Sequence, residues 1–187
     1  NQTALPEFCL LQIKPMVLTG LHRSNSLSLL NQKSLFCKSS VALGDGQIDT
    51  LRDLIIIRSK SFDIRKSKEI AKELAEVNKR FKNGSQYILC GPGRWGSTDP
   101  WLGIPVQWKA ISQSKVIIEV GIKGLPIDPS FGSHFFQNIT SLHIAYFTID
   151  SKQKKDILNL SFLKNLDIKE SGEYLDWYTF KNPFNVI

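Results

Sequence analysis

One loop combines the residue types that suit the binding of a small anion: glycines and prolines around a single arginine. The apolar segment 86–90 runs into Gly-Pro-Gly-Arg-Trp-Gly-Ser-Thr-Asp-Pro-Trp at 91–101. Glycine and proline fix unusual backbone angles, so a loop built from them holds one shape. A guanidinium in such a loop is suited to binding a phosphate or a carboxylate through two parallel hydrogen bonds. The ligand-binding candidates in this loop are Gly93, Arg94, Trp95 and Asp99.

Each of these loop residues also has a structural alternative. Arg94 could brace the loop by donating hydrogen bonds to backbone carbonyls or to Asp99. Asp99 stands before Pro100, a pair that is typical of turns. Trp95, like other large aromatic residues, more often packs in a core than lines a pocket. The sequence leaves both interpretations of Arg94 open.

A second group of polar side chains lies further along the chain. His134 precedes two phenylalanines, and Gln137 and Asn138 follow them. A histidine there could act as an acid, a base or a donor to phosphate, although a histidine beside two phenylalanines is commonly structural. Gln137 and Asn138 could bond a ligand or cap a helix. We therefore add His134, Gln137 and Asn138 to the ligand-binding candidates.

Several common nucleotide-binding and catalytic motifs are missing from the sequence. Gly91, Gly93 and Gly96 match G-x-G-x-x-G, but a dinucleotide site also needs a helix that begins within the motif. Pro100 and Pro105 interrupt any such helix. The sequence has no P-loop, no pair of histidines at metal-ligand spacing and no recognisable serine–histidine–aspartate arrangement. It therefore predicts no metal site and assigns no catalytic residue.

The composition is that of an ordinary globular protein. Of the 187 residues, 42% are hydrophobic and 22% are charged, and no apolar run is long enough to span a bilayer. The net charge of +7 comes from basic residues spread along the chain. We therefore expect no nucleic-acid partner and no membrane partner, whereas small anions remain compatible with the charge. The three cysteines lack metal-ligand spacing, and reduced thiols indicate the cytoplasm.

Strands that alternate with helices predict an α/β fold. We expect a mixed sheet with helices packed on it and antiparallel hairpins at its edges. The clearest helix is 64–82, in which apolar residues recur at helical spacing on one face. The expected core strands are 54–57, 86–90, 115–120 and 143–149.

Weaker signals complete the predicted organisation. We expect a hairpin turn at Gly44-Asp45-Gly46, a short helix at 134–142, a helix near 152–165, and two final strands joined at 181–183. We divide the chain into the end of an upstream domain (1–16), a connector (17–40) and a carboxyl-terminal α/β domain (41–187). Since the first residues read like the middle of a protein, we expect a fragment of a longer polypeptide.

The amino-terminal residues resemble a known nucleotide-binding strand. The segment 8–15, Phe-Cys-Leu-Leu-Gln-Ile-Lys-Pro, is similar to the last strand of the ATP-grasp domain of phosphoenolpyruvate synthases and pyruvate phosphate dikinases. In that family a glutamine and an arginine of this strand face the nucleotide phosphates. The resemblance implies nucleotide binding by Gln12 and Lys14. Lysine here replaces the arginine, which keeps the charge but not the planar fork.

A longer block resembles the carboxyl-terminal region of the same family of large bacterial proteins. Its parts are 42–46, 91–106, 128–130 and 134–138. The resemblance implies a parent phosphotransferase that acts on pyruvate with ATP and Mg²⁺ as cofactors. The chain lacks the phosphohistidine motif of that family and is too short for its phosphoenolpyruvate-binding barrel. We therefore expect no catalysis by this chain alone.

Two functions follow from these observations. In the first, the chain is a phosphate- or carboxylate-binding part of the phosphotransferase, with Arg94 gripping the anion and the rest of the parent polypeptide as partner. In the second, it is a non-catalytic regulatory or interaction module in which Arg94 only braces the loop. An open cleft where Arg94 and His134 converge would favour the first function, and a packed loop with a buried Arg94 would favour the second.

Overall fold

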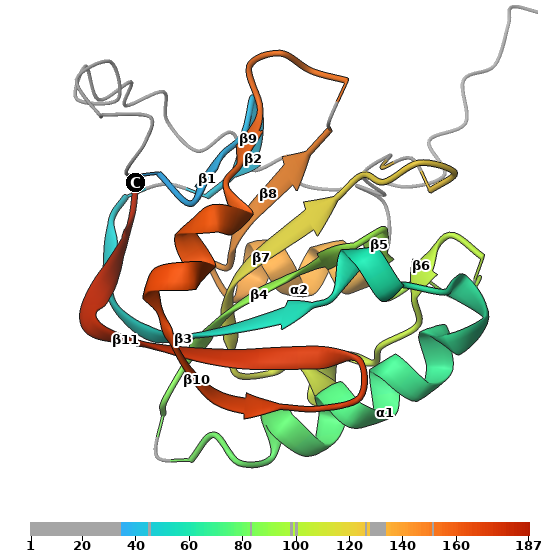
Figure 1. Ribbon diagram of the computed structural model, residues 1–187, viewed down its shortest axis with the longest axis horizontal. Coiled ribbons are helices and arrows are strands. Elements are labelled where there is room, and N and C mark those ends of the chain that lie inside the picture. Colours follow the sequence, from blue (N-terminus) through green and yellow to red (C-terminus); the bar gives the residue numbers. More distant parts are fainter. Residues whose placement is uncertain are drawn as a thin grey trace, which may run out of the picture.

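A mixed β-sheet organises the part of the chain that the structure describes (Figure 1). The computed structural model describes residues 35–44, 46–82, 84–97, 99, 101–125, 127, 134–150 and 152–187, with the backbone alone for His134 and Asn165. The main sheet contains β2 (Val41–Leu43), β3 (Ile48–Ile57), β4 (Tyr87–Pro92), β7 (Ser114–Val120), β8 (Ala145–Ile149), β10 (Asp167–Ser171) and β11 (Leu175–Val186). Two small pairs join β1 (Cys37–Lys38) to β9 (Ile157–Leu158) and β5 (Arg94–Trp95) to β6 (Gly103–Ile104).

The helical elements are short. The α-helices among the described residues are α1 (Ser67–Asn78) and α2 (His134–Ser141). Single turns of 3₁₀-helix are η3 (Ser59–Ser61), η4 (Ile64–Lys66) and η5 (Trp108–Ala110), and a longer one is η6 (Leu160–Asn165).

Four parallel strands form the centre of the main sheet, in the order β3-β4-β7-β8. All residues of β4 are buried, and Ile88 lies between Leu54 of β3 and Val116 of β7 in register. A parallel strand covered on both faces needs a continuous apolar run, which β4 and β7 supply. This confirms the predicted strands 54–57, 86–90 and 115–120, and β8 confirms most of 143–149.

Antiparallel strands close both edges of the sheet. β11 runs antiparallel to β3 and forms a hairpin with β10, and β2 runs antiparallel to β8 at the opposite edge. The prediction of an α/β fold, with a mixed sheet and antiparallel strands at its edges, is therefore confirmed.

Two apolar layers cover the two faces of the sheet. On one face, α1 and α2 pack against Ile55, Leu89 and Ile117. On the other face, Phe36 and the η6 segment cover Ile56, Ile88 and Ile118. Figure 1 shows η6 in front of the sheet and α2 behind it. The alternation of strand side chains between the two faces explains why consecutive isoleucines of β3 enter different layers.

The predicted hairpin at Gly44-Asp45-Gly46 is wrong. β2 pairs with β8 and β3 pairs with β4 and β11, so β2 and β3 lie apart in the sheet. Gly44 and Gly46 do have positive φ angles of 114° and 87°, as a turn requires. The chain instead passes from β2, at one edge of the sheet, to β3, which lies inside the sheet between β4 and β11.

Two predictions near the carboxyl terminus are also wrong. The helix expected near 152–165 is replaced by β9 and η6, because the Asp156 carboxylate accepts hydrogen bonds from the backbone amides of Ser40 and Asp150 and fixes a turn. The strand break expected at 181–183 does not occur, because β11 runs through it. Pro183 is tolerated there because the register between β11 and β3 is irregular between Thr179 and Phe184.

The remaining boundaries differ in smaller ways. The α-helix expected over 64–82 spans only Ser67–Asn78, since Asp63 caps the preceding 3₁₀ turn by accepting from the Arg65 amide. α2 confirms the short helix near 134–142. The folded region begins before residue 41, because Phe36 is buried and β1 pairs with β9. The predicted upstream segment 1–16, with Gln12 and Lys14, lies outside the described residues.

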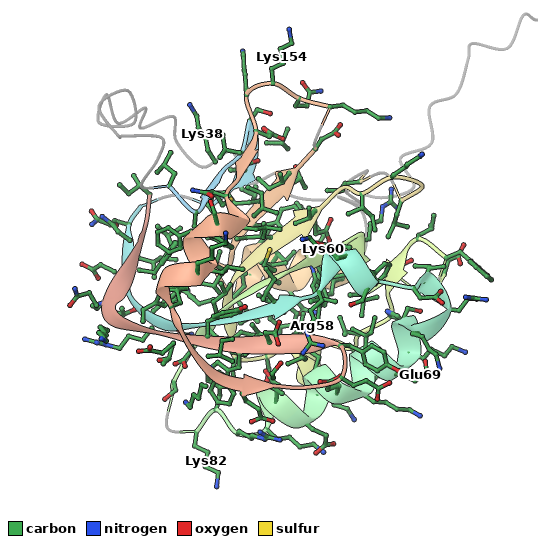
Figure 2. All side chains as sticks on the ribbon, viewed as in Figure 1. Lys38, Arg58, Lys60, Glu69, Lys82 and Lys154 are labelled. Atoms are coloured by element: carbon green, nitrogen blue, oxygen red, sulfur yellow. The ribbon has the colours of Figure 1, made fainter. Side chains whose placement is uncertain are left out.

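Basic side chains are dispersed over the surface. Lys38, Lys60, Lys82 and Lys154 project from different parts of the molecule in Figure 2. In the described part of the chain, no helix has the length and apolar character needed to cross a membrane.

Candidate functional site

The Gly/Pro loop leaves the sheet at the carboxyl end of β4 and turns back beside β7. Its first residues stay attached to the sheet, since the Gly93 amide donates to the Val120 carbonyl at 2.9 Å. β5 then pairs with β6, and the Arg94 amide donates to the Leu102 carbonyl at 3.2 Å. Ligand sites in open α/β sheets lie at the carboxyl ends of the parallel strands, which is where this loop stands.

Close backbone packing explains the glycines of the loop. A Cβ atom at Gly103 would lie 2.0 Å from the Arg94 carbonyl oxygen, so β5 and β6 approach each other only because Gly103 has no side chain. A Cβ at Gly91 would lie 2.6 Å from the Trp95 ring. Gly93 has a φ of 71°, a conformation that favours glycine. The backbone at Gly91, Gly93 and Gly103 therefore leaves no room for a larger residue without strain.

A cavity of about 220 Å³ opens between this loop, the sheet and α2. The loop supplies one wall with Arg94, Trp95, Gly96, Ser97, Asp99 and Leu102. The sheet contributes Glu119 and Tyr146, and α2 contributes Phe135, Phe136 and Ile139. The cavity thus combines a cation, a carboxyl group and hydroxyl groups with an aromatic wall.

Glu119 is a buried carboxyl group in this cavity, with 3% of its surface exposed. One oxygen, Oε1, accepts a hydrogen bond from the Trp95 amide at 2.9 Å, and Oε2 accepts from the Tyr146 hydroxyl at 2.6 Å. Burial raises the pKa of Glu119 to about 7, against the opposing effects of these two hydrogen bonds and of the Arg94 charge. Glu119 therefore changes its charge near neutral pH.

Two buried aromatic residues, Tyr146 and Trp95, lie beside Glu119. Burial and the Glu119 charge raise the pKa of Tyr146 well above its usual range, so this phenol stays protonated and donates to the carboxylate. The Trp95 ring is also buried, and its Nε1 has no hydrogen-bond partner in the part of the chain that the structure describes. A buried donor of this kind is unusual in a folded protein.

The structure brings together only some of the predicted site residues. Arg94, Trp95 and Asp99 all lie on the cavity wall, and Gly93 is in the turn that positions them. Asp99 is exposed and accepts a hydrogen bond from the Trp101 amide at 2.9 Å, which is the turn-forming role weighed for it. Arg94 is half-buried and lines the cavity, whereas the second alternative expected it to be buried in a packed loop. The first alternative expected Arg94 to converge with His134, whose side chain lies outside the described part of the structure.

The residues expected on α2 are placed differently. His134 begins α2, and its side chain lies outside the described part of the structure. Gln137 is exposed and Asn138 is half-buried, and neither is among the described residues that line the cavity. Their neighbours Phe135 and Phe136 occupy the wall instead.

Sequence analysis missed Glu119 and Tyr146 as candidates. A signal for Glu119 was present, because a lone carboxylate in the run Val-Ile-Ile-Glu-Val has the same strand parity as the buried Ile117. No local signal singles out Tyr146. It reaches Glu119 only because β7 and β8 are neighbours, with Ile117 opposite Tyr146 in register.

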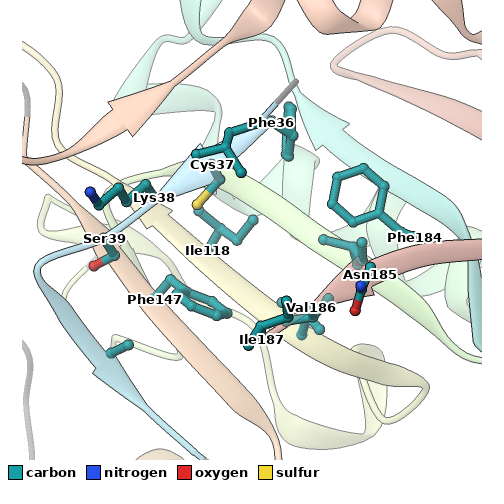
Figure 3. A pocket seen from close by; sticks show the side chains of 14 residues that line it. Phe36, Cys37, Lys38, Ser39, Ile118, Phe147, Phe184, Asn185, Val186 and Ile187 are labelled. Atoms are coloured by element: carbon teal, nitrogen blue, oxygen red, sulfur yellow. The ribbon is translucent and has the colours of Figure 1, made fainter. Parts of the chain in front are cut away.

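A second cavity of about 220 Å³ lies on the opposite face of the sheet (Figure 3). Its walls are mostly apolar and include Ile118, Phe147, Phe184 and Val186. Cys37 also lines it, and burial raises the pKa of this thiol to about 12. The Cys37 thiol is therefore un-ionised at neutral pH and is a poor nucleophile.

The described residues contain no group of three or more His, Cys, Asp or Glu side chains that could hold a metal ion. Comparison of the chain with protein-family models, with curated proteins and with solved structures found no match.

Proposed function

We propose that this chain is a ligand-binding domain of a phosphoenolpyruvate synthase-like phosphotransferase, and that the cavity beside Arg94 takes a phosphate or carboxylate ligand. The observation that carries the proposal is the presence of Arg94 and the buried Glu119 in one cavity at the carboxyl ends of β4 and β7. A perturbed ionisable group in a cleft is a candidate for a functional site, and ligand sites commonly combine an apolar wall with a few polar groups.

The parent enzyme supplies the chemistry in this proposal. ATP and Mg²⁺ are cofactors of the parent, and the described residues of this chain hold no candidate phosphohistidine. The chain itself binds and orients its ligand, and it does not consume ATP with pyruvate when isolated. Cys37 and Cys90 belong to the same apolar layer, and both are free thiols. Because reduced thiols are typical of the cytoplasm, we place the protein there.

A ligand screen by thermal unfolding tests this proposal. The probes are inorganic phosphate, pyruvate, phosphoenolpyruvate, AMP and ATP. A ligand at about 100 times its dissociation constant stabilises the native state by about 2.7 kcal/mol. For a protein of this size that corresponds to a rise in Tm of roughly 5–10 °C. Absence of any rise with all five probes at millimolar concentration would count against an anion site.

The Arg94→Lys variant tests the role of the guanidinium. Lysine keeps the charge but loses one of two parallel hydrogen bonds, so binding of the best anion should weaken roughly tenfold to a hundredfold. Arg65→Lys is the matched control, because Arg65 is exposed and pairs with Asp63 away from the cavity. Equal affinities for the two variants would remove Arg94 from the site. A loss of stability in Arg94→Lys with unchanged anion affinity would favour the brace.

Two exposed apolar residues favour a second candidate function, a non-catalytic interaction module. Trp101 and Leu102, at the tip of the same loop, are 65% and 44% exposed. In this alternative they contact another part of the parent polypeptide. A Trp101→Ser variant should then weaken association with the separately expressed upstream part of the parent, and unchanged association would argue against the alternative.

A further inference from the structure

Two described residues of the cavity wall can carry opposite charges. Arg94 supplies one fixed positive charge, and Glu119 supplies one negative charge when it is ionised. Tyr146 stays neutral, and the Asp99 carboxylate is exposed and bonds its own loop through the Trp101 amide. The described wall residues of α2 carry no charge: Phe135, Phe136 and Ile139.

Glu119 keeps hydrogen-bonding capacity for a ligand. A carboxylate offers about four acceptor positions, and the Trp95 amide and the Tyr146 hydroxyl occupy one on each oxygen. A guanidinium offers five donors in a planar fork, and an anion needs only two of them. One ligand can therefore address both groups if it carries an anionic end and a hydrogen-bond-donating end.

Charge decides which ligand fits this pair. A simple anion would add a negative charge close to the buried Glu119 carboxylate, which is unfavourable unless a proton enters with it. A zwitterion adds no net charge, and its two ends complement Arg94 and Glu119 separately. The cavity of about 220 Å³ has room for a small molecule that contacts both groups.

We propose that the cavity binds a small amino acid as a zwitterion, with its carboxylate at Arg94 and its ammonium group at Glu119. The inference rests on the proposed function, because it uses the same anion-binding guanidinium. It adds the cationic half of the ligand and gives Glu119 the role of recognising it.

Four probes of nearly equal shape test the assignment: alanine, lactate, propionate and isopropylamine. Affinities are measured by isothermal titration calorimetry at pH 7.5, with inorganic phosphate as a separate anion probe. Alanine should bind at least about tenfold more tightly than lactate or propionate, the effect of one charge-assisted hydrogen bond. It should also bind more tightly than isopropylamine, which lacks the carboxylate.

The outcomes separate this inference from the proposed function. Propionate binding as tightly as alanine overturns the zwitterion but leaves the anion site standing, as does binding of phosphate without alanine. Failure of alanine, propionate and phosphate alike overturns both proposals. Isopropylamine binding as tightly as alanine also overturns both, because the anionic end would then contribute nothing.

The Glu119→Gln variant tests the cationic half directly. Glutamine has the same shape and can still accept from the Trp95 amide, but it carries no charge. Alanine should lose at least about tenfold in affinity, while propionate should not weaken. The control is Glu76→Gln, on the exposed surface of α1, which should alter neither affinity. Equal losses for alanine and propionate would overturn the assignment of Glu119.

Wild-type protein provides an independent test that does not depend on how a variant folds. Between pH 7.5 and pH 5.5 Glu119 gains a proton, so the ammonium group loses its partner. Alanine affinity should then fall by at least about threefold, whereas propionate affinity should rise. The same direction of change for both ligands would overturn the inference.

Discussion

Replacing Glu119 by glutamine should change how the stability of this protein depends on pH. Glutamine imitates the protonated carboxyl group at every pH, whereas Glu119 ionises as pH rises. The pKa of Glu119 is raised from 4.5 to about 7 by burial, so the native state holds this proton more tightly than the unfolded chain does. The contribution of Glu119 to stability is therefore complete below pH 4.5 and is lost as pH rises through about 7.

The size of the expected change in stability follows from the pKa shift of Glu119. Each pKa unit corresponds to 1.36 kcal/mol, so a change from 4.5 to about 7 gives about 3 kcal/mol. The free energy of unfolding of Glu119→Gln, relative to wild type, should therefore rise by about 3 kcal/mol between pH 4.5 and pH 8. Near the melting temperature that corresponds to a relative change in Tm of roughly 6–12 °C.

Thermal unfolding followed by circular dichroism at several pH values measures this difference. Glu76→Gln is again the matched control, because its carboxylate is exposed and forms a surface pair with Lys79 at 2.6 Å. Such pairs contribute less than about 1 kcal/mol, so the free energy of unfolding of the control should depend on pH almost as that of wild type does. If Glu119→Gln also runs parallel to wild type, within about 0.5 kcal/mol, then burial does not perturb Glu119 and the reasoning is refuted.

Three further substitutions test the architecture around the site, each by equilibrium unfolding in urea. Arg58→Lys should lower stability by about 1–3 kcal/mol, because the guanidinium bonds both carboxylate oxygens of Asp176 at 2.9 and 2.7 Å and lysine cannot reproduce that fork; an unchanged midpoint would contradict this. Gly103→Ala should lower stability by about 2 kcal/mol or more and disturb anion binding, because its Cβ would meet the Arg94 carbonyl oxygen; wild-type stability would disprove the close strand approach. His143→Gly should raise stability by about 0.5–1 kcal/mol, because residue 143 has a φ of 50° and glycine adopts it without strain; a loss of stability would show that the imidazole makes an outweighing contribution.

Local sequence patterns were enough to predict the central buried strands and the helix α1. The continuous apolar runs of β3, β4 and β7 predict buried strands because a strand covered on both faces can expose no polar side chain. The stripe containing Ile70, Leu74 and Val77 predicts α1 for the corresponding helical reason, and all three residues are buried. The shape of the Gly/Pro loop also follows from its own residues, as the tight approach at Gly103 illustrates.

Strand order and the composition of the site were decided only by tertiary structure. Gly44 and Gly46 specify a turn, but the turn does not specify the partner of β2, which is β8 and not the next strand in sequence, β3. The segment 152–165 has helical spacing, yet Asp156 bonds distant backbone amides and the segment forms β9 and η6 instead. These outcomes depend on contacts between residues far apart in sequence, which no local pattern encodes.

The cavity illustrates the same division most directly. The sequence pointed to Arg94 because loop chemistry is local. It did not pair Arg94 with Glu119 and Tyr146, because that grouping requires β4, β7 and β8 to lie side by side in parallel. The raised pKa of Glu119 is a tertiary property as well, since the same side chain in the unfolded chain would be hydrated and would ionise normally. The sequence thus indicated Arg94 as a candidate, and burial in the folded sheet gave Glu119, which lines the same cavity, its raised pKa.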